Sequence, residues 1–141
     1  LLAGPNPWPS EAEGGGRFVN LSNHPVEAWP QAQRVAAREL GAGEPLDFRG
    51  GFPSVDPQAG PEEVAALAEQ TVAEVLRMDP AIVFVSGDFT LTHALVTRFR
   101  AEGVRCVAAT TRRAVTESAR PDGSVVRTST FEFVRWREYS A

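Results

Sequence analysis

The sequence predicts a three-layer α/β domain with a mainly parallel sheet and a C-terminal antiparallel β-hairpin. Short apolar runs rich in Val, Ile and Phe alternate along the chain with segments of helical spacing. In the stretch 81–113, two such runs are joined by one helical segment. A right-handed crossover of this kind makes the two strands parallel, so their C-terminal ends meet at one edge of the sheet.

The length and composition predict a single globular domain. A chain of 141 residues with 43% hydrophobic content can bury its own core. We expect that domain to span residues 17–141. Residues 1–16 contain three prolines and four glycines without hydrophobic periodicity. They are predicted to form a flexible lead-in, or alternatively an arm that docks through Trp8.

The charged residues restrict the classes of ligand. The formal net charge is −4, which disfavours a broad basic surface for duplex nucleic acid. The chain has no Lys, so every permanently positive side chain is an Arg. This excludes Schiff-base and P-loop lysine chemistry, and it leaves the guanidinium group as the cation available for phosphate.

The single cysteine and the absence of long apolar runs indicate a cytoplasmic protein. Cys106 lies within a predicted buried strand and cannot form an internal disulfide, so we expect an inert core thiol. No apolar run is long enough to span a bilayer, and the first residues do not resemble a signal peptide. No membrane association is predicted.

The first half of the chain predicts two strands and two helices. Residues 18–21 form a first strand, and the turn-forming residues 22–25 follow it. Apolar spacing predicts a helix over 29–40 that ends at Gly41, and residues 46–48 indicate a short second strand. After a loop rich in Gly and Pro, Pro61 opens a helix that continues to Met78.

The second half predicts the central crossover and the hairpin. Residues 82–85 form a strand, 90–102 a helix that ends at Gly103, and 104–108 the next strand. We expect residues 110–113 to form a loop after that strand. Residues 114–117 and 125–139 then flank a Pro-Asp-Gly-Ser turn as an antiparallel hairpin.

This alternation is typical of an open, Rossmann-like fold, in which ligands bind beyond the C-terminal ends of the strands. Three loops reach that edge, namely 22–25, 86–90 and 110–113. The chain lacks both G-x-G-x-x-G and G-x-x-x-x-G-K-[ST]. Classical NAD, FAD and P-loop sites are therefore disfavoured, and no cofactor is predicted.

The segment 86–90 enters a helix and suits an anionic ligand. Gly87 would let the backbone approach the ligand, the amides of Phe89 and Thr90 would face an anion, and Asp88 could accept a hydrogen bond from a ribose hydroxyl. The alternative interpretation makes Asp88 or Thr90 a helix N-cap and Gly87 a turn residue.

The segment Thr110, Thr111, Arg112 and Arg113 suits a phosphodiester. Each guanidinium can bind two oxygens while a Thr hydroxyl donates to a third. The alternative is a hairpin entry with solvated Arg side chains.

His24 is the candidate acid or base, because histidine titrates near neutral pH and this one lies in the first loop. A histidine in a turn without a catalytic task is the alternative. His93 lies on a predicted helix and is assigned a structural role. The Cys, His and acidic residues show no metal-binding spacing, so no metal is predicted.

The last strand carries apolar residues on both faces. Regular alternation puts Phe131, Phe133 and Tyr139 on one face, and Val134 and Trp136 on the other. Both faces are therefore expected to pack, one of them against the chain's own helices or a partner subunit.

Four segments resemble the small CRISPR-associated, Rossmann-like proteins encoded beside type III CRISPR systems, which are similar to CARF domains. They are F-V-N-L-S-N-H-P, S-G-D-F-T-L-T-H-A-L-V, A-A-T-T-R-R-A-V and F-E-F-V-R-W-R-E-Y, within residues 18–139. CARF domains bind cyclic oligoadenylate messengers as two-fold dimers. Several small relatives are ring nucleases that cleave the ring without a metal.

The resemblance implies a homodimer with cyclic tetra-adenylate across its axis and a ribose 2′-hydroxyl that attacks the adjacent phosphorus. The matching positions assign catalysis to His24, Ser22 and Arg112, with Arg112 as the cation, Ser22 and Thr111 as positioning groups and His24 in proton transfer. The resemblance implies ligand binding by Asn23, Gly87, Asp88, Thr90, Thr110 and Thr111, to which the residue patterns described above add Phe89 and Arg113. A non-catalytic binder of the messenger, acting as a sponge or a sensor, stays an alternative, as does an unrelated nucleotide-binding or interaction protein.

Overall fold

The computed structural model of the chain describes residues 16–140. The lead-in predicted over residues 1–16 therefore lies outside the described residues, apart from Gly16. The elements follow in the order β1 (Arg17–Leu21), the 3₁₀ helix η2 (Val26–Ala28), α1 (Gln31–Leu40), β2 (Leu46–Asp47), α2 (Pro61–Leu76), β3 (Pro80–Val85), α3 (Phe89–Ala101), β4 (Arg105–Ala119) and β5 (Val125–Glu138).

The strands form one mixed sheet in the order β2-β1-β3-β4-β5. Neighbouring strands from β2 to β4 are parallel, and β5 runs antiparallel to β4. The predicted α/β class and mainly parallel sheet are confirmed. From β1 the chain moves outward to β2 and then returns to β3 on the other side of β1. Loops therefore diverge between the C-terminal ends of β1 and β3, where a crevice forms in sheets of this topology.

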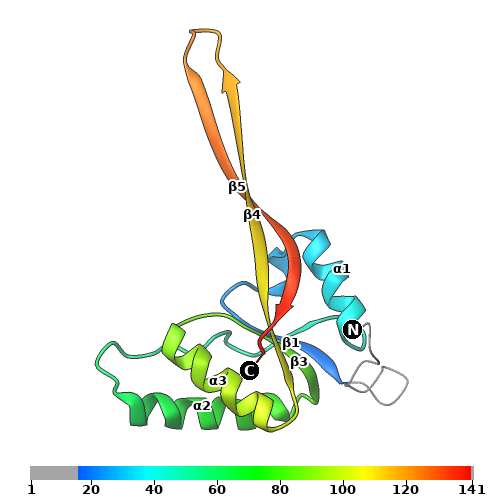
Figure 1. Cartoon of the computed structure of the whole chain (residues 1–141), viewed down its shortest axis with the longest axis vertical. Coiled ribbons are helices and arrows are strands. Elements are labelled where there is room, and N and C mark those ends of the chain that lie inside the picture. Colours follow the sequence, from blue (N-terminus) through cyan, green and yellow to red (C-terminus); the bar gives the residue numbers. More distant parts are fainter. Residues whose placement is uncertain (1–15, 141) are drawn as a thin grey trace.

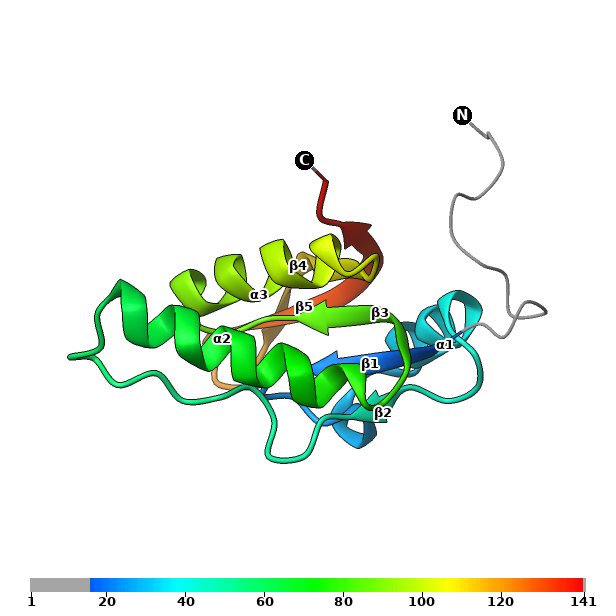
Figure 2. The ribbon, with the colours of Figure 1, turned by 90° about the horizontal axis from the view of Figure 1, so that it is seen from below.

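Helices cover both faces of the sheet, because the central strands are apolar on both sides. Val83 and Val85 of β3 pack with α2 and α3, which lie side by side in Figure 2. Ile82 and Phe84 point the other way, into the cluster that contains η2 and α1 residues. This arrangement explains why β3 is a continuous apolar run in the sequence.

Aromatic rings pack the segment between η2 and α1 against β5. Trp136 of β5 lies 4.9 Å from Phe84, 5.0 Å from Phe18 and 5.5 Å from Trp29 between ring centroids. Phe133 adds a further ring at 5.1 Å from Trp136. Tilted aromatic pairs at these distances stabilise a fold beyond the area that they bury.

The prediction of a loop at 110–113 is wrong. β4 continues without interruption through these residues to Ala119, and each of them pairs with β5. Thr is β-branched and Arg tolerates an exposed strand, so nothing local ends β4 before the turn at Pro121. The hairpin is consequently longer than expected, and Figure 1 shows it projecting far from the rest of the molecule.

A β-bulge changes the predicted faces of β5. Thr110 pairs with Arg135 and Thr111 with Phe133, so Val134 is an additional residue on β5. The Thr110 hydroxyl donates to the carbonyl of Arg135 (3.0 Å) and accepts from the Arg135 amide (3.2 Å). As a result Phe133 and Trp136 lie on the same face, which corrects the assignment from regular alternation.

We expect the buried thiol of Cys106 to lower the free energy of unfolding at alkaline pH. The side chain is fully buried, and burial raises the pKa of its thiol from 9.0 to about 12. Above pH 9 the unfolded chain loses this proton while the folded chain retains it. The contribution is therefore complete below pH 9 and falls by about 1.4 kcal/mol per pH unit until about pH 12. Between pH 8 and 10.5 the free energy of unfolding, measured in urea, should fall by roughly 2 kcal/mol more in the wild type than in Cys106→Ala. Equal losses in the two proteins would contradict this assignment.

Candidate ligand-binding site

A cavity of about 370 Å³ opens at the C-terminal ends of β1 and β3, beside the part of β4 that continues past the end of β3. The loop after β1, the start of α1 and the hairpin complete its wall. Its polar lining side chains are His24, Gln33, Ser86, Thr111 and Tyr139, and its aromatic ones also include Trp29, Phe84, Phe131 and Phe133. The cavity therefore lies beside the β1/β3 switch point, at the sheet edge that the sequence predicts.

Hydrogen bonds hold the backbone of His24 while its side chain stays exposed at the cavity. The His24 carbonyl accepts from Asn20 Nδ2 and from Trp29 Nε1, both at 2.8 Å. Asn20 Nδ2 also donates to Asp47 Oδ1 (2.8 Å), which in turn accepts from the Val26 amide (3.0 Å). The loop is thereby fixed at both ends, and the fold sets the position of the His24 backbone.

Ser22 belongs to this supporting network. Its side chain is buried at 3% exposure, its hydroxyl donates to Asn20 Oδ1 (2.7 Å), and it accepts from the His24 amide (3.2 Å). The Ser22 hydroxyl, which is predicted to position a ligand, thus forms hydrogen bonds to other residues of the protein. Asn23 is exposed and lines a separate pocket of about 350 Å³ together with Arg49. The structure therefore does not bring Asn23 into the cavity of His24.

The start of α3 matches the N-cap interpretation. The Asp88 carboxylate accepts from the Leu91 amide (2.9 Å) and from the Thr90 hydroxyl (2.7 Å). These two bonds, the backbone one first, lower the pKa of Asp88 below its ordinary 3.8. The carboxylate already occupies the positive end of this helix, so an anionic ligand is disfavoured there. Phe89 is 91% exposed beside it.

Gly87 makes room for a side chain of the protein itself. A Cβ at this position would collide with the ring carbons of Phe52. Phe52 is buried in the core beneath α2 and α3. A glycine is therefore needed at position 87 because the Phe52 ring packs against its backbone.

Strand geometry separates the two hairpin arginines. Thr111 lines the cavity, and Arg113 lies two residues further along β4, on the same face of the strand. Arg112 alternates to the opposite face. Arg113 Nε donates to the Ser129 hydroxyl at 2.8 Å. Of the two, Arg113 is consequently the cation on the cavity side.

The N-terminus of α1 borders the cavity without a side-chain cap. Its N-cap is Pro30, which supplies no capping hydrogen bond, and its first turn contains no acidic residue. Pro30 and Gln33 both line the cavity. The partial positive charge of this helix end is therefore not neutralised by a local carboxylate.

Sequence reasoning identified His24 and Thr111 but missed most of the aromatic wall. Trp29 and Phe84 were interpreted only as core residues, because apolar periodicity does not distinguish a cavity wall from a core. Gln33 was missed because its place is set by how α1 packs on the sheet. In residues 16–140, no three His, Cys, Asp or Glu side chains are grouped so that they could hold a metal ion.

Fold and site together define an α/β protein with an aromatic, neutral-polar cavity at the switch point of a mixed sheet. The chain belongs to the family described as the uncharacterized protein MJ1673 family, which matches residues 16–137. No curated protein and no solved structure matches the chain. Along the described part of the chain, no helix has the length and apolar character needed to cross a membrane.

Proposed function

We propose that this protein is a metal-independent ring nuclease that binds and cleaves a cyclic oligoadenylate, most favourably cyclic tetra-adenylate, in the cytoplasm. The proposal combines the resemblance to CRISPR-associated, CARF-like proteins with the cavity. The observation that carries it is the placement of His24, whose backbone is held by Asn20 and Trp29 while the imidazole is exposed at the cavity.

The chemistry of the cavity suits adenine bases and phosphates. Exposed aromatic rings such as Phe131 offer stacking surfaces, which accept any base and contribute about 1–3 kcal/mol each in single-strand binding. The described lining residues include no Asp or Glu, so no carboxylate repels a phosphate from within. The uncapped N-terminus of α1 adds amide donors and a favourable dipole.

In the proposed reaction a ribose 2′-oxygen attacks the adjacent phosphorus and displaces the 5′-oxygen of the next nucleotide. The new bond joins the 2′-oxygen to phosphorus, and the bond from phosphorus to the 5′-oxygen breaks. The 2′-hydroxyl proton passes to His24, and the leaving oxygen takes a proton from the imidazolium or from water. The products are linear fragments that end in a 2′,3′-cyclic phosphate. Alignment of the attacking oxygen supplies much of the rate.

The remaining site residues divide into positioning and binding groups. Ser22 acts through the loop that it stabilises, and Thr111 donates to the ligand from β4. We assign the phosphate cation to Arg113 rather than to Arg112, because Arg113 shares the face of Thr111. In a two-fold homodimer, a two-fold ring would make each of these contacts twice.

A non-catalytic binder is the second candidate, and the lining of the cavity favours it. His24 and Tyr139 are the only titratable side chains among the described lining residues, and no Arg is among them. Binding needs only the aromatic and neutral polar groups. Cleavage additionally needs the 2′-oxygen in line and a cation at the phosphate.

Incubation with cyclic tri-, tetra- and hexa-adenylate in EDTA tests the proposal. We expect linear products ending in cyclic phosphate, from cyclic tetra-adenylate most readily, with separation by chromatography and binding measured by calorimetry on the same samples. Tight binding without products would identify a sponge or sensor. If no ring binds, the proposed function is wrong.

A further inference from the structure

The outer part of the β4–β5 hairpin lacks a neighbour in the described structure. We call residues 111–133 the arm. β3 pairs with β4 only from Arg105 to Val107, so β4 and β5 continue beyond it as a two-stranded ribbon. At about 3.3 Å per residue, the β4 half of the arm extends roughly 30 Å. An isolated two-stranded ribbon is marginally stable in water, and Figure 1 shows this one reaching away from the helices.

The two faces of the arm differ in chemistry. Val115, Val125 and Phe131 are 45%, 59% and 69% exposed, and alternation with the cross-strand register puts all three on one face. The same face holds Thr111 and Phe133, which line the cavity. The opposite face consists mainly of polar residues, namely Arg112, Thr116, Ser118, Thr128, Thr130 and Glu132, with Ala114 and Val126. Arg113, Glu117, Arg127 and Ser129 lie on the same face between these residues, and Arg127 Nε pairs with Glu117 Oε1 at 3.1 Å. Apolar side chains therefore recur along this face from the cavity to the tip, interrupted by an ion pair.

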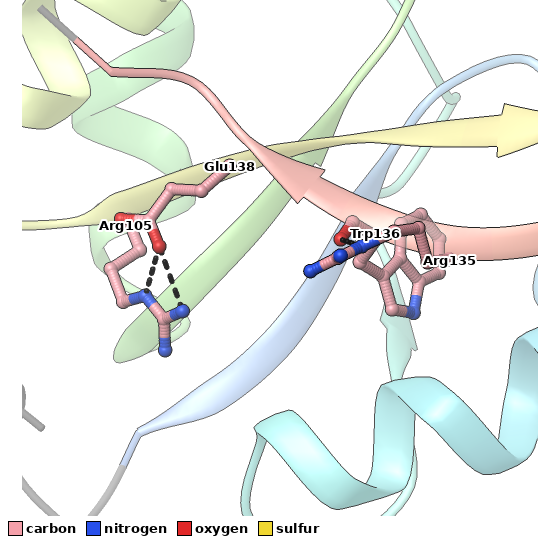
Figure 3. Close-up of polar contacts among 4 residues, drawn as sticks. All are labelled: Arg105, Arg135, Trp136 and Glu138. Carbon is pink, nitrogen blue, oxygen red and sulfur yellow. Dashed lines mark hydrogen bonds and ion pairs between the residues drawn. The ribbon is translucent and has the colours of Figure 1, made fainter. Parts of the chain in front are cut away.

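The base of the arm is firmly attached to the domain. Arg105 donates to Glu138 Oε1 through Nε (3.1 Å) and Nη2 (2.8 Å), and Arg135 Nε donates to the Trp136 carbonyl (3.2 Å), as Figure 3 shows. The aromatic cluster around Trp136 secures the same end of β5. These contacts fix the base of the arm and therefore set the direction in which the ribbon leaves the domain.

We propose that the apolar face of the arm docks on a second copy of this chain, the two arms lying antiparallel across a two-fold axis. Such an arrangement puts the tip of each arm over the base of the other, where the partner's cavity opens. The apolar face then covers an equivalent apolar face, and both cavities lose their open side.

Charge and symmetry favour a second copy over another partner. The segment 105–138 contains seven Arg and four acidic residues, whereas residues 16–104 contain seven Arg and twelve acidic residues. The net charges are +3 and −5, and the arm itself has four Arg and three acidic residues, a net charge of +1. The tip of each arm is therefore attracted to the domain of the other chain, beside which it lies in this arrangement. An antiparallel contact between identical ribbons is self-complementary, because the two-fold axis repeats every contact between the two chains.

The oligomeric state of the full chain tests the docking surface without any ligand. Light scattering after size exclusion should give twice the 15.2 kDa chain mass for the wild type. The double variant Val115→Glu/Phe131→Glu should be monomeric, with a dimer dissociation constant at least 100-fold higher than that of the wild type. The matched control, Thr116→Glu/Thr130→Glu, places the same charges one residue away on the opposite face and should stay dimeric. Far-UV circular dichroism checks that each variant folds.

Three outcomes overturn the inference. They are a monomeric wild type, an apolar-face variant that stays dimeric, and a control variant that also dissociates. The closing of the cavity by the partner's arm rests on the proposed function, so binding of cyclic tetra-adenylate is measured in parallel. A dimer that is disrupted only by the apolar-face variant but binds no ring would retain the interface and refute the function. A protein that binds the ring but gives one of the three outcomes above would retain the proposed function and refute the interface.

Discussion

Replacing His24 with alanine is expected to lower the rate of ring cleavage by about 10²–10⁴-fold, the usual contribution of a positioned acid or base. Binding of cyclic tetra-adenylate should change little, by less than about threefold, because stacking and phosphate contacts come from other residues. Single-turnover cleavage and calorimetric binding with the same protein samples separate the two effects.

The hydrogen bonds of the loop that carries His24 support this expectation. The hydrogen bonds that fix the loop use the carbonyl and amide of His24, not its imidazole. Alanine keeps both backbone groups, so the fold of the loop should survive.

The chain provides a matched control in its second histidine. His93 lies exposed on α3 and does not line the cavity. His93→Ala should therefore cleave like the wild type. Equal losses in both variants, or full activity in His24→Ala, would remove His24 from the mechanism.

The variant Gly87→Ala is expected to lower the free energy of unfolding by about 2–3 kcal/mol, at the upper end of the range for an overpacked core. The new methyl group would occupy the place of the Phe52 ring, which is only 6% exposed and packs in the core. The backbone of Gly87 is not in the left-handed region, so the penalty comes from the collision rather than from the conformation of the residue. Urea unfolding followed by circular dichroism measures it.

A double-mutant cycle with Phe52→Ala identifies the cause. Phe52→Ala alone should cost about 3–5 kcal/mol because it leaves a cavity in the core. In that background Gly87→Ala should cost less than about 0.5 kcal/mol, because the ring that it would strike is gone. An undiminished cost in the Phe52→Ala background would refute the steric explanation.

Most element boundaries could be predicted from local signals. Pro61 begins α2 as expected, because a proline at the first helical position loses no hydrogen bond. Gly103 follows the C-cap residue Glu102 of α3 and has φ +78°, the conformation for which a glycine is expected at the end of a helix. β3 was recognised by its apolar run, since a strand covered on both faces leaves no alternation. Each of these features depends on a few adjacent residues.

The candidate site was only partly predictable. His24 is predicted at the sheet edge because a right-handed crossover makes the strands parallel, so the loops that follow them lie at the same edge. The assignment of residues 110–113 to a loop failed because Thr and Arg occur in loops and in exposed strands alike. Their pairing with β5 joins residues that are 18 to 25 positions apart, from Arg113↔Phe131 to Thr110↔Arg135, and no local pattern records it. The roles of Ser22 and Gly87 likewise depend on Asn20 and on the distant Phe52.

The sequence by itself determined the α/β class, the order of the elements, the use of Arg as the sole permanent cation and the loop that carries His24. These follow from composition, periodicity and short-range turn chemistry, which act within a few residues. Tertiary structure decided which side chains share the cavity, which arginine lies on its side and that β4 and β5 extend into an arm. Those outcomes depend on cross-strand register and on a single bulge at Val134, because one additional residue changes which side chains share a face of the sheet.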